Sequence, residues 1–410
     1  MDILRRLVGL LLQGAALAGT AAVARAQDEN EALQIAREVT PRVERAVGLT
    51  FKREPAIEVR TREQVRGYLT RKLAEEMPPA ELAAVQRTYR AFGLIPPTTD
   101  LRKLMLDLYS EQVAGFFDPD SSALFVVRGA DPAMLQVIMA HELVHALQDQ
   151  YMSLNTILKL RRQNDRQMAG QAVAEGQATL SGIEAMVPGA DVSGVLGDWD
   201  TVRELIRAQQ SAMPVFAGAP LFLQEGLLFP YVAGAQFMRD FDARKARPGE
   251  EPYGDRLPVS TAQILHPDLY TGHVVPERVG FGPDPGDTLV YDDDFGEFET
   301  GVALRAWGVA QGVAESAAAG WDGDRFEVLG APGGTVVMWA TAWRTPTDAA
   351  EFQRALTRGW GANHPAGGSE RWQVDRLDIR GTPVIRLVAA PVSWKGWARL
   401  PAVALVRLRG

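Results

Sequence analysis

Cysteine is absent from the chain, and histidine is scarce. The lack of cysteine excludes disulfides, thiolate catalysis and thiolate-bound metal sites. Any metal ion must therefore be held by nitrogen and oxygen ligands. The 410 residues include only five histidines, namely His141, His145, His266, His273 and His364. Two of them, His141 and His145, fall within five residues of each other, which makes this pair the first candidate for a metal site.

Acidic residues also outnumber basic ones. The formal net charge is −8, and the sequence contains no polybasic cluster. A nucleic-acid partner would require a basic face, so no nucleic acid is expected as a partner. The hydrophobic content of 46% and the charged content of 23% are those of an ordinary globular protein, and the length allows two domains.

A long apolar run without charged residues lies near the N-terminus. Arg5 and Arg6 precede the apolar stretch Leu7–Val23, and Ala24–Ala26 has the small-x-small pattern of a cleavage site. We predict that residues 1–26 are a signal peptide, with an uncleaved membrane anchor as the alternative. The predicted location is therefore secreted, periplasmic or in the cell envelope.

A second apolar run, Ala217–Met238, contains Gln224, Glu225 and Pro230. These interruptions favour a buried helix over a membrane span. No transmembrane span is therefore expected after signal removal. Glu225 is expected either to line a cleft or to pair with an arginine in the core.

Periodicity and turn residues predict an α+β fold in three regions. Residues 27–105 are predicted to form a helical region with one strand, and Pro41 is expected to break or restart the first helix. Residues 106–275 are predicted to be mostly helical around a small hairpin sheet. Residues 276–410 are predicted to form a C-terminal α+β region.

Individual elements follow from the same patterns. Two β-prone runs, Gln112–Phe117 and Ala123–Val127, flank an Asp/Pro/Ser turn and predict a hairpin. Asp131 is expected to cap a helix that runs to about Tyr151. A second helix is expected from Arg166 to Met186, ended by Pro188 and Gly189. Residues 243–300 are expected to be mostly loop with a short helix at Ser260–Leu265, and Glu297–Ala319 is expected to be helical. The tail is predicted to contain the strands Phe326–Leu329, Thr335–Ala342, Trp372–Ile379 and Pro383–Ala389 and the helix Thr347–Gly359.

The strongest chemical signal is the run from His141 to Gln150, which contains an HExxH motif. Residues four apart lie on one face of a helix, so His141 and His145 are predicted to point at one metal ion. Glu142 lies one residue round the helix, where it can reach a metal-bound water without being a ligand. Three protein ligands and a water form a catalytic zinc site, so a third ligand is required.

Glu175 is the predicted third ligand. It lies 30 residues after His145 on the next expected helix, where its neighbours are nearly all small. Small side chains allow two helices to approach closely, and Gly170 and Gly176 within a helix require a packing reason. Asp149, four residues after His145, is expected either to orient a histidine or to be a polar residue in the last turn.

The chain resembles a known family at these motifs. HELVHALQDQ, followed about thirty residues later by AEGQA, resembles the Glu-zincin metallopeptidases, a broad thermolysin-like group. The resemblance is closer to exported bacterial and archaeal proteins with HELxHALQDQ and EGxA motifs. Further matches are Leu227–Tyr231, Ser260–Tyr270 and Gly320–Phe326.

The resemblance implies a zincin-like metallopeptidase core within residues 106–275, with a small sheet beside the HExxH helix. It implies zinc bound by His141, His145 and Glu175, with Glu142 as general base. By analogy, the strand with Ala114, Gly115 and Phe116 would be the edge to which an extended peptide adds. One departure is Thr179, which occupies the position where thermolysin-like enzymes place an aspartate that supports a zinc histidine.

Stabilisation of the oxyanion requires one more donor near the metal. The candidates are Tyr231, His266, Tyr270 and His273, and any of them could equally be structural. The predicted function is an exported zinc metallopeptidase that hydrolyses peptide or protein substrates. The alternatives are a zinc-stabilised, non-cleaving binding protein of the envelope and a zinc hydrolase that acts on another amide.

Overall fold

The computed structural model describes residues 23–129, 132–187, 208, 213–246, 250–282, 286–365 and 368–406. Three predictions fall wholly or partly outside these residues. They are residues 1–22 of the predicted signal peptide 1–26, the predicted helix cap at Asp131, and the predicted helix stop at Pro188 and Gly189. The fold is α+β, as predicted, with several separate sheets.

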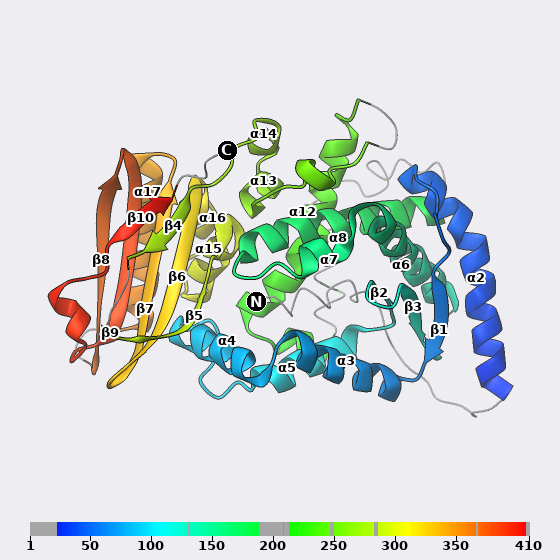
Figure 1. Ribbon diagram of the computed structural model, residues 1–410, viewed down its shortest axis with the longest axis horizontal. Helices are drawn as coiled ribbons and strands as arrows, with labels where there is room; N and C mark the ends of the chain where they lie inside the picture. The colour runs from blue at the N-terminus through cyan, green and yellow to red at the C-terminus, as the bar shows by residue number, and fades with distance from the viewer. Residues whose placement is uncertain are drawn as a thin grey trace.

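The helices and strands follow one another along the chain as Figure 1 labels them. The first helices are α2 (Val23–Val47), α3 (Arg62–Glu76), α4 (Pro79–Ala91), α5 (Leu101–Gln112), α6 (Pro132–Met152), α7 (Leu154–Leu158), α8 (Asn164–Met186), α11 (Pro214–Ala217) and α12 (Leu221–Asp242). The later ones are η2 (Gly254–Arg256), α13 (Thr261–Leu265), α14 (Pro267–Thr271), α15 (Gly296–Ala306), α16 (Gln311–Ala318), α17 (Pro346–Asn363) and η3 (Lys395–Ala398). The strands are β1 (Ala56–Arg60), β2 (Gly115–Asp118), β3 (Ala123–Val127), β4 (Arg278–Phe281), β5 (Thr288–Asp293), β6 (Trp321–Ala331), β7 (Gly334–Trp343), β8 (Glu370–Ile379), β9 (Thr382–Pro391) and β10 (Val403–Val406).

A three-stranded sheet lies beside α6 in the order β1-β3-β2. Strand β3 pairs parallel with β1 and antiparallel with β2, so the predicted hairpin is present and β2 is an edge strand. One face of the sheet contributes Leu124 and Val126 to an apolar core shared with α2, α6 and α8. The sheet and α2 lie at one end of the molecule, and the C-terminal sheet lies at the other (Figure 1).

The prediction that Pro41 breaks the first helix is wrong, because α2 is continuous from Val23 to Val47. Proline removes one backbone hydrogen bond from a helix and crowds the preceding turn. Pro41 lies on the exposed side of α2. The opposite face, which includes Val39 and Val43, is buried in the core with α6 and α8. Burial of that face compensates for the missing hydrogen bond.

Helices α8 and α12 cross with their backbones in contact. A Cβ atom added to Gly234 of α12 would lie 2.0 Å from the carbonyl oxygen of Ala172, and one added to Gly176 of α8 would lie 2.2 Å from Gly234. Gly176 therefore has the packing reason that its place within a helix requires. Gly170 has one as well, since its Cβ would lie 2.8 Å from Ile157 of α7.

The C-terminal region is built on a five-stranded antiparallel sheet in the order β5-β6-β7-β9-β8. Two predictions here need correction. Residues 243–300, expected to be mostly loop, also form β4 and β5, whose partners β10 and β6 lie further along the chain. Residues 297–319 form two helices, α15 and α16, because Gly308 adopts a φ of 87° between them.

Buried carboxylates join this region to the central helices. The backbone N–H groups of Asn164 and Asp165, at the start of α8, donate to Asp293 at 3.1 Å and to Asp294 at 2.6 Å. In turn, the Asp165 carboxylate accepts the Thr261 N–H at the start of α13 at 2.9 Å. Each carboxylate satisfies N–H groups that a helix leaves unpaired at its N-terminus. None of the helices in the described residues combines the length and apolar character that a membrane span needs.

The crossing of α8 and α12 gives a testable prediction. Gly234→Ala would press a methyl group onto the Ala172 carbonyl, so we expect the free energy of unfolding to fall by about 1–3 kcal/mol, as in other overpacked cores. Gly226→Ala on the same helix is the matched control, because nothing lies within 4 Å of its Cβ position. That variant should be neutral or up to about 1 kcal/mol more stable. Equal urea denaturation midpoints for the two variants would contradict the close crossing.

Candidate metal centre

Helices α6 and α8 bring three metal-binding side chains to one point. The Nε2 atoms of His141 and His145 lie 3.1 Å apart. Oε2 of Glu175 lies 3.2 Å from the first and 3.3 Å from the second. The HExxH spacing places both imidazoles on one face of α6, and α8 supplies the carboxylate, so the structure brings together all three predicted ligands.

The spacing of these three atoms can be compared with that of a zinc site. Zinc bonds of about 2.0–2.1 Å at tetrahedral angles separate ligand atoms by about 3.3 Å. The observed separations of 3.1–3.3 Å match this value. Two neutral imidazoles and one carboxylate are also a donor set that zinc prefers, and they leave a fourth position open. The residues therefore fit a catalytic type of zinc site.

The imidazole rings are held in the orientation that metal binding requires. Nδ1 of His145 lies 2.9 Å from Oε1 of Gln148, and the ring of His141 hydrogen-bonds to the backbone of Ala178. An amide oxygen can only accept, so Nδ1 of His145 carries the proton. In the neutral ring this leaves the lone pair on Nε2, which faces the cluster.

Burial and mutual charge set the electrostatics of the cluster. Burial lowers the pKa of His141. Burial also opposes the charge on His145, but the Glu175 carboxylate outweighs this effect and raises the pKa of His145 to about 9. Burial would raise the pKa of Glu175, yet the two imidazoles hold it at about 2. The carboxylate therefore stays ionised and provides the negative charge that a cation would meet.

Glu142 lies between the cluster and the edge strand. Its Oε2 accepts the backbone N–H of Phe117 in β2 at 2.8 Å, and only 3% of the residue is exposed. Burial raises the pKa of Glu142 to about 8, although the nearby His145 lowers it. A carboxylate whose pKa lies near neutrality is well suited to take up and return a proton. Its place beside the cluster agrees with the predicted role of a base that is not a ligand.

The edge strand passes directly over α6. A Cβ on Gly115 would lie 2.6 Å from the side chain of Ile138, so glycine permits this approach. The Val127 N–H donates to the Ala114 carbonyl at 2.9 Å, which fixes the antiparallel register. In that register the backbone groups of Gly115 and Phe117 point away from β3, whereas Phe116 pairs with it. The outer edge of β2 therefore faces the Glu142 side of the cluster.

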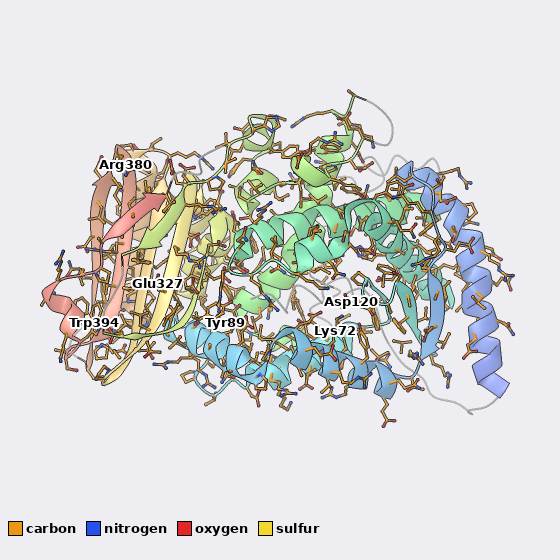
Figure 2. All side chains as sticks on the ribbon, viewed as in Figure 1. Lys72, Tyr89, Asp120, Glu327, Arg380 and Trp394 are labelled. Atoms are coloured by element: carbon orange, nitrogen blue, oxygen red, sulfur yellow. The ribbon has the colours of Figure 1, made fainter. Side chains whose placement is uncertain are left out.

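Helix α3 holds the hairpin from the other side. Lys72 makes ion pairs with Asp118 and Asp120 at the turn between β2 and β3. Figure 2 shows Lys72 and Asp120 facing each other below the central helices. The ring of Tyr68 packs on Phe116, with the centroids 5.1 Å apart. These contacts fix the position of the edge strand relative to α6.

Of the two alternatives given for Asp149, the structure supports a polar residue in the last turn of α6 over a partner of a histidine. Its carboxylate accepts the Leu154 N–H at 2.9 Å and so caps α7. The histidine contact belongs to its neighbour Gln148, three residues after His145 and on the same side of the helix. The sequence patterns above did not single out Gln148, although this spacing was a signal that could have found it. Thr179, at the position of the missing aspartate, has a buried hydroxyl that makes no hydrogen bond within the described residues.

Of the four candidate oxyanion donors, Tyr231 lies beside the cluster. Its ring is nearly parallel to that of His141, with the centroids 6.1 Å apart. The hydroxyl of Tyr270 instead donates to the carbonyl of Arg256 at 2.9 Å. His273 follows α14 in a turn with a φ of 51°. Tyr231 therefore lies beside the candidate cluster, whereas the hydroxyl of Tyr270 is bound elsewhere.

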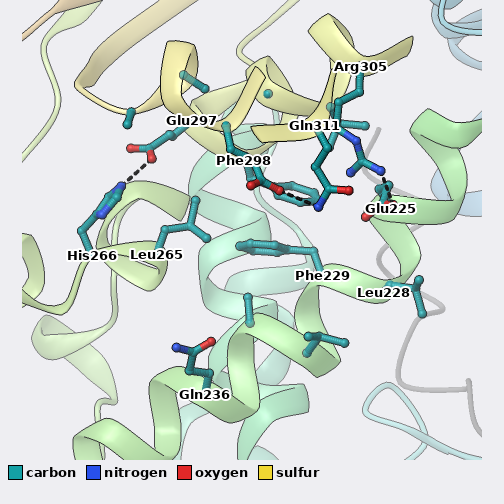
Figure 3. A pocket seen from close by; sticks show the side chains of 17 residues that line it. Glu225, Leu228, Phe229, Gln236, Leu265, His266, Glu297, Phe298, Arg305 and Gln311 are labelled. Carbon is teal, nitrogen blue, oxygen red and sulfur yellow. Dashed lines mark hydrogen bonds and ion pairs between the residues drawn. The ribbon is translucent and has the colours of Figure 1, made fainter. Parts of the chain in front are cut away.

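His266 belongs to a separate cavity of about 330 Å³ between α12 and the pair α15 and α16 (Figure 3). There it hydrogen-bonds to Glu297, which raises the pKa of the imidazole. At the other end of this cavity Glu225 forms an ion pair of 3.0 Å with Arg305. The predicted pairing of Glu225 with an arginine is thus confirmed, and the cavity that it lines contains none of the cluster residues. Of the two alternatives given for His266, an oxyanion donor or a structural residue, these contacts support the structural one.

Comparison with known proteins bears on the C-terminal region alone. A domain family of unknown function, DUF8575, matches residues 287–393, which comprise β5 to β9 and α15 to α17. No curated protein matches the chain, and neither does any solved structure. The matched segment contains none of the cluster residues His141, Glu142, His145 and Glu175. The function of the cluster must therefore be inferred from its own geometry.

Proposed function

We propose that the protein is a zinc metallopeptidase with a zincin-like core. One observation carries the proposal, namely that Nε2 of His141, Nε2 of His145 and Oε2 of Glu175 lie 3.1–3.3 Å from one another. Two imidazoles and one carboxylate would hold the zinc ion and leave one position for water. The zincin-like resemblance of the motifs agrees with this donor set.

Glu142 distinguishes a catalytic site from a purely structural one. When bound, zinc lowers the pKa of its water to about 7 and polarises the scissile carbonyl. Glu142 would accept a proton from a water at the open position of the cluster and deliver it to the leaving amine. A site that only stabilises the fold needs no buried base, yet this one keeps the Glu142 carboxylate beside the cluster at 3% exposure. Tyr231, whose ring stacks on that of His141, is the proposed donor to the oxyanion.

The substrate would be an extended peptide or protein segment. Strand β2 is an edge strand, and Gly115 and Phe117 direct their backbone groups away from β3. A peptide that adds to this edge gains main-chain hydrogen bonds and brings its carbonyls past Glu142. The leader-like residues 1–26 support action outside the cytoplasm, as a secreted, periplasmic or envelope enzyme.

The first test of this function separates metal binding from catalysis. Glu142→Gln should bind one zinc ion per chain, as the wild type does, because Glu142 is not a ligand. It should cleave a mixed peptide library at least about 100-fold more slowly, since general base catalysis supplies roughly that factor or more. Metal content by atomic emission and product analysis by mass spectrometry would give the two readouts. Zinc in both proteins with cleavage by neither would instead support a non-cleaving, zinc-stabilised binding protein.

The second test removes a ligand. Glu175→Gln and His145→Ala should lower zinc affinity by more than about 100-fold, since even the loss of an outer partner of a zinc ligand costs about 10–100-fold. Dialysis of the wild type against a chelator should likewise abolish cleavage, and added zinc should restore it. His266→Gln is the control, because His266 pairs with Glu297 in the separate cavity and should leave both zinc and activity intact. Full zinc occupancy in the Glu175 variant would rule out the three-ligand site.

A further inference from the structure

A chain of hydrogen bonds leads away from the metal cluster at His145. Nδ1 of His145 lies 2.9 Å from Oε1 of Gln148. The amide nitrogen of Gln148 donates to the backbone carbonyl of Ala174 at 2.9 Å. A carbonyl can only accept, so the Ala174 contact fixes which end of the Gln148 amide is the donor. The amide oxygen must then face the imidazole, and His145 must donate to it.

The chain continues through a second amide to a carboxylate. Nε2 of Gln148 also donates to Oε1 of Gln177 at 2.9 Å, and Nε2 of Gln177 donates to Oε2 of Glu251 at 2.7 Å. The three bonds from His145 to Glu251 therefore all run in one direction. Hydrogen bonds aligned head to tail polarise one another in a low-dielectric interior. All four residues are at most 4% exposed, so water does not screen the chain.

The neighbouring groups keep this direction. The hydroxyl of Tyr253 donates to Oε1 of Gln177, which therefore accepts from two donors. Lys245 lies 3.8 Å from the second oxygen of Glu251 and provides a positive charge at the end of the chain. Neither Thr179 nor Asp149 makes a hydrogen bond to either imidazole. Within the described residues, no carboxylate other than the ligand Glu175 contacts a ring nitrogen of His145.

We propose that Gln148, Gln177 and Glu251 form an amide relay that positions His145 and strengthens it as a metal ligand. The relay holds the proton on Nδ1, so the lone pair of Nε2 points to the metal. It transmits the negative charge of Glu251 through two amides, where other zinc sites place a carboxylate directly on the histidine. These are positioning residues, because none of them touches the metal. The inference rests on the proposed zinc site and names residues that this site requires.

The decisive measurement is the zinc affinity of single variants, determined by competition with a chromogenic chelator. Burial raises the pKa of Glu251 to about 7, and the relay requires this carboxylate to be ionised. The measurement should therefore be made at pH 8. Gln148→Leu removes the acceptor from Nδ1 while keeping the volume, and zinc affinity should fall about 10–100-fold. Gln177→Leu and Glu251→Gln interrupt the relay further from the metal, so they should show smaller losses of about 3–10-fold.

Two variants separate this role from a packing role. Gln148→Glu keeps an acceptor on Nδ1 of His145, so it should bind zinc at least ten-fold more tightly than Gln148→Leu, even if it is less stable. Gln167→Leu is the matched control, because Gln167 is a fully buried amide of α8 that donates to the carbonyl of Leu158 instead. Its zinc affinity should equal that of the wild type. If Gln148 had only a packing role, Gln148→Leu and Gln167→Leu would both lose thermal stability, and their zinc affinities would be the same.

The outcomes distinguish this inference from the proposed function. If the wild type takes up no zinc, the metal centre and the relay fall together. If the wild type binds zinc and Gln148→Leu binds it as tightly, the relay alone is overturned. The relay is also overturned if Gln148→Glu binds zinc no better than Gln148→Leu. Should Gln148→Leu fail to fold, unchanged zinc affinity in both Gln177→Leu and Glu251→Gln would overturn the relay instead.

Discussion

Helix α8 carries Glu175 of the candidate metal cluster, and its backbone lies in contact with that of α12. At this crossing Gly176 and Gly234 leave no room for a Cβ atom. The same helix packs against α6, where a Cβ on Gly182 would lie only 3.5 Å from the backbone nitrogen of His141. Side chains between helices normally hold their axes 8–10 Å apart. Small residues on α8 permit this close packing on both sides, and Glu175 reaches the two imidazoles of α6 from the same helix.

The C-terminal region contributes to the same helix from its other end. Asp293 and Asp294, which fall inside the segment matched by the domain family, accept the first N–H groups of α8. Asp165 of α8 then caps α13. Negative charge at a helix N-terminus is stabilised by the helix dipole, although burial raises the pKa of Asp165 to about 7. The metal cluster and the C-terminal sheet are thus linked through one rigid helix and its caps.

The sequence predicted what depends on local spacing. His141, Glu142 and His145 follow from the helical repeat. The small residues around Glu175 indicated a close helix contact, but Gly176 makes it with α12 and not with the helix of the two histidines. The sequence did not reveal contacts between distant segments. Glu251 meets Gln177 across 74 residues, and β5 finds its partner β6 only after two helices. Likewise, the capping role of Asp149 depends on a backbone N–H of the next helix, which no side-chain pattern marks.

The contact between Glu142 and the edge strand links substrate binding to catalysis in the proposed enzyme. In the structure the Phe117 N–H donates to Glu142, and this N–H is one of the groups that β2 directs away from β3. A peptide added to the edge would place a carbonyl on the same N–H, because strand pairing uses these outward groups. The peptide would then displace the Glu142 carboxylate from the strand. The Phe117 N–H would thus serve Glu142 in the free protein and the substrate backbone in the proposed complex, which would free the carboxylate to turn toward the water at the cluster.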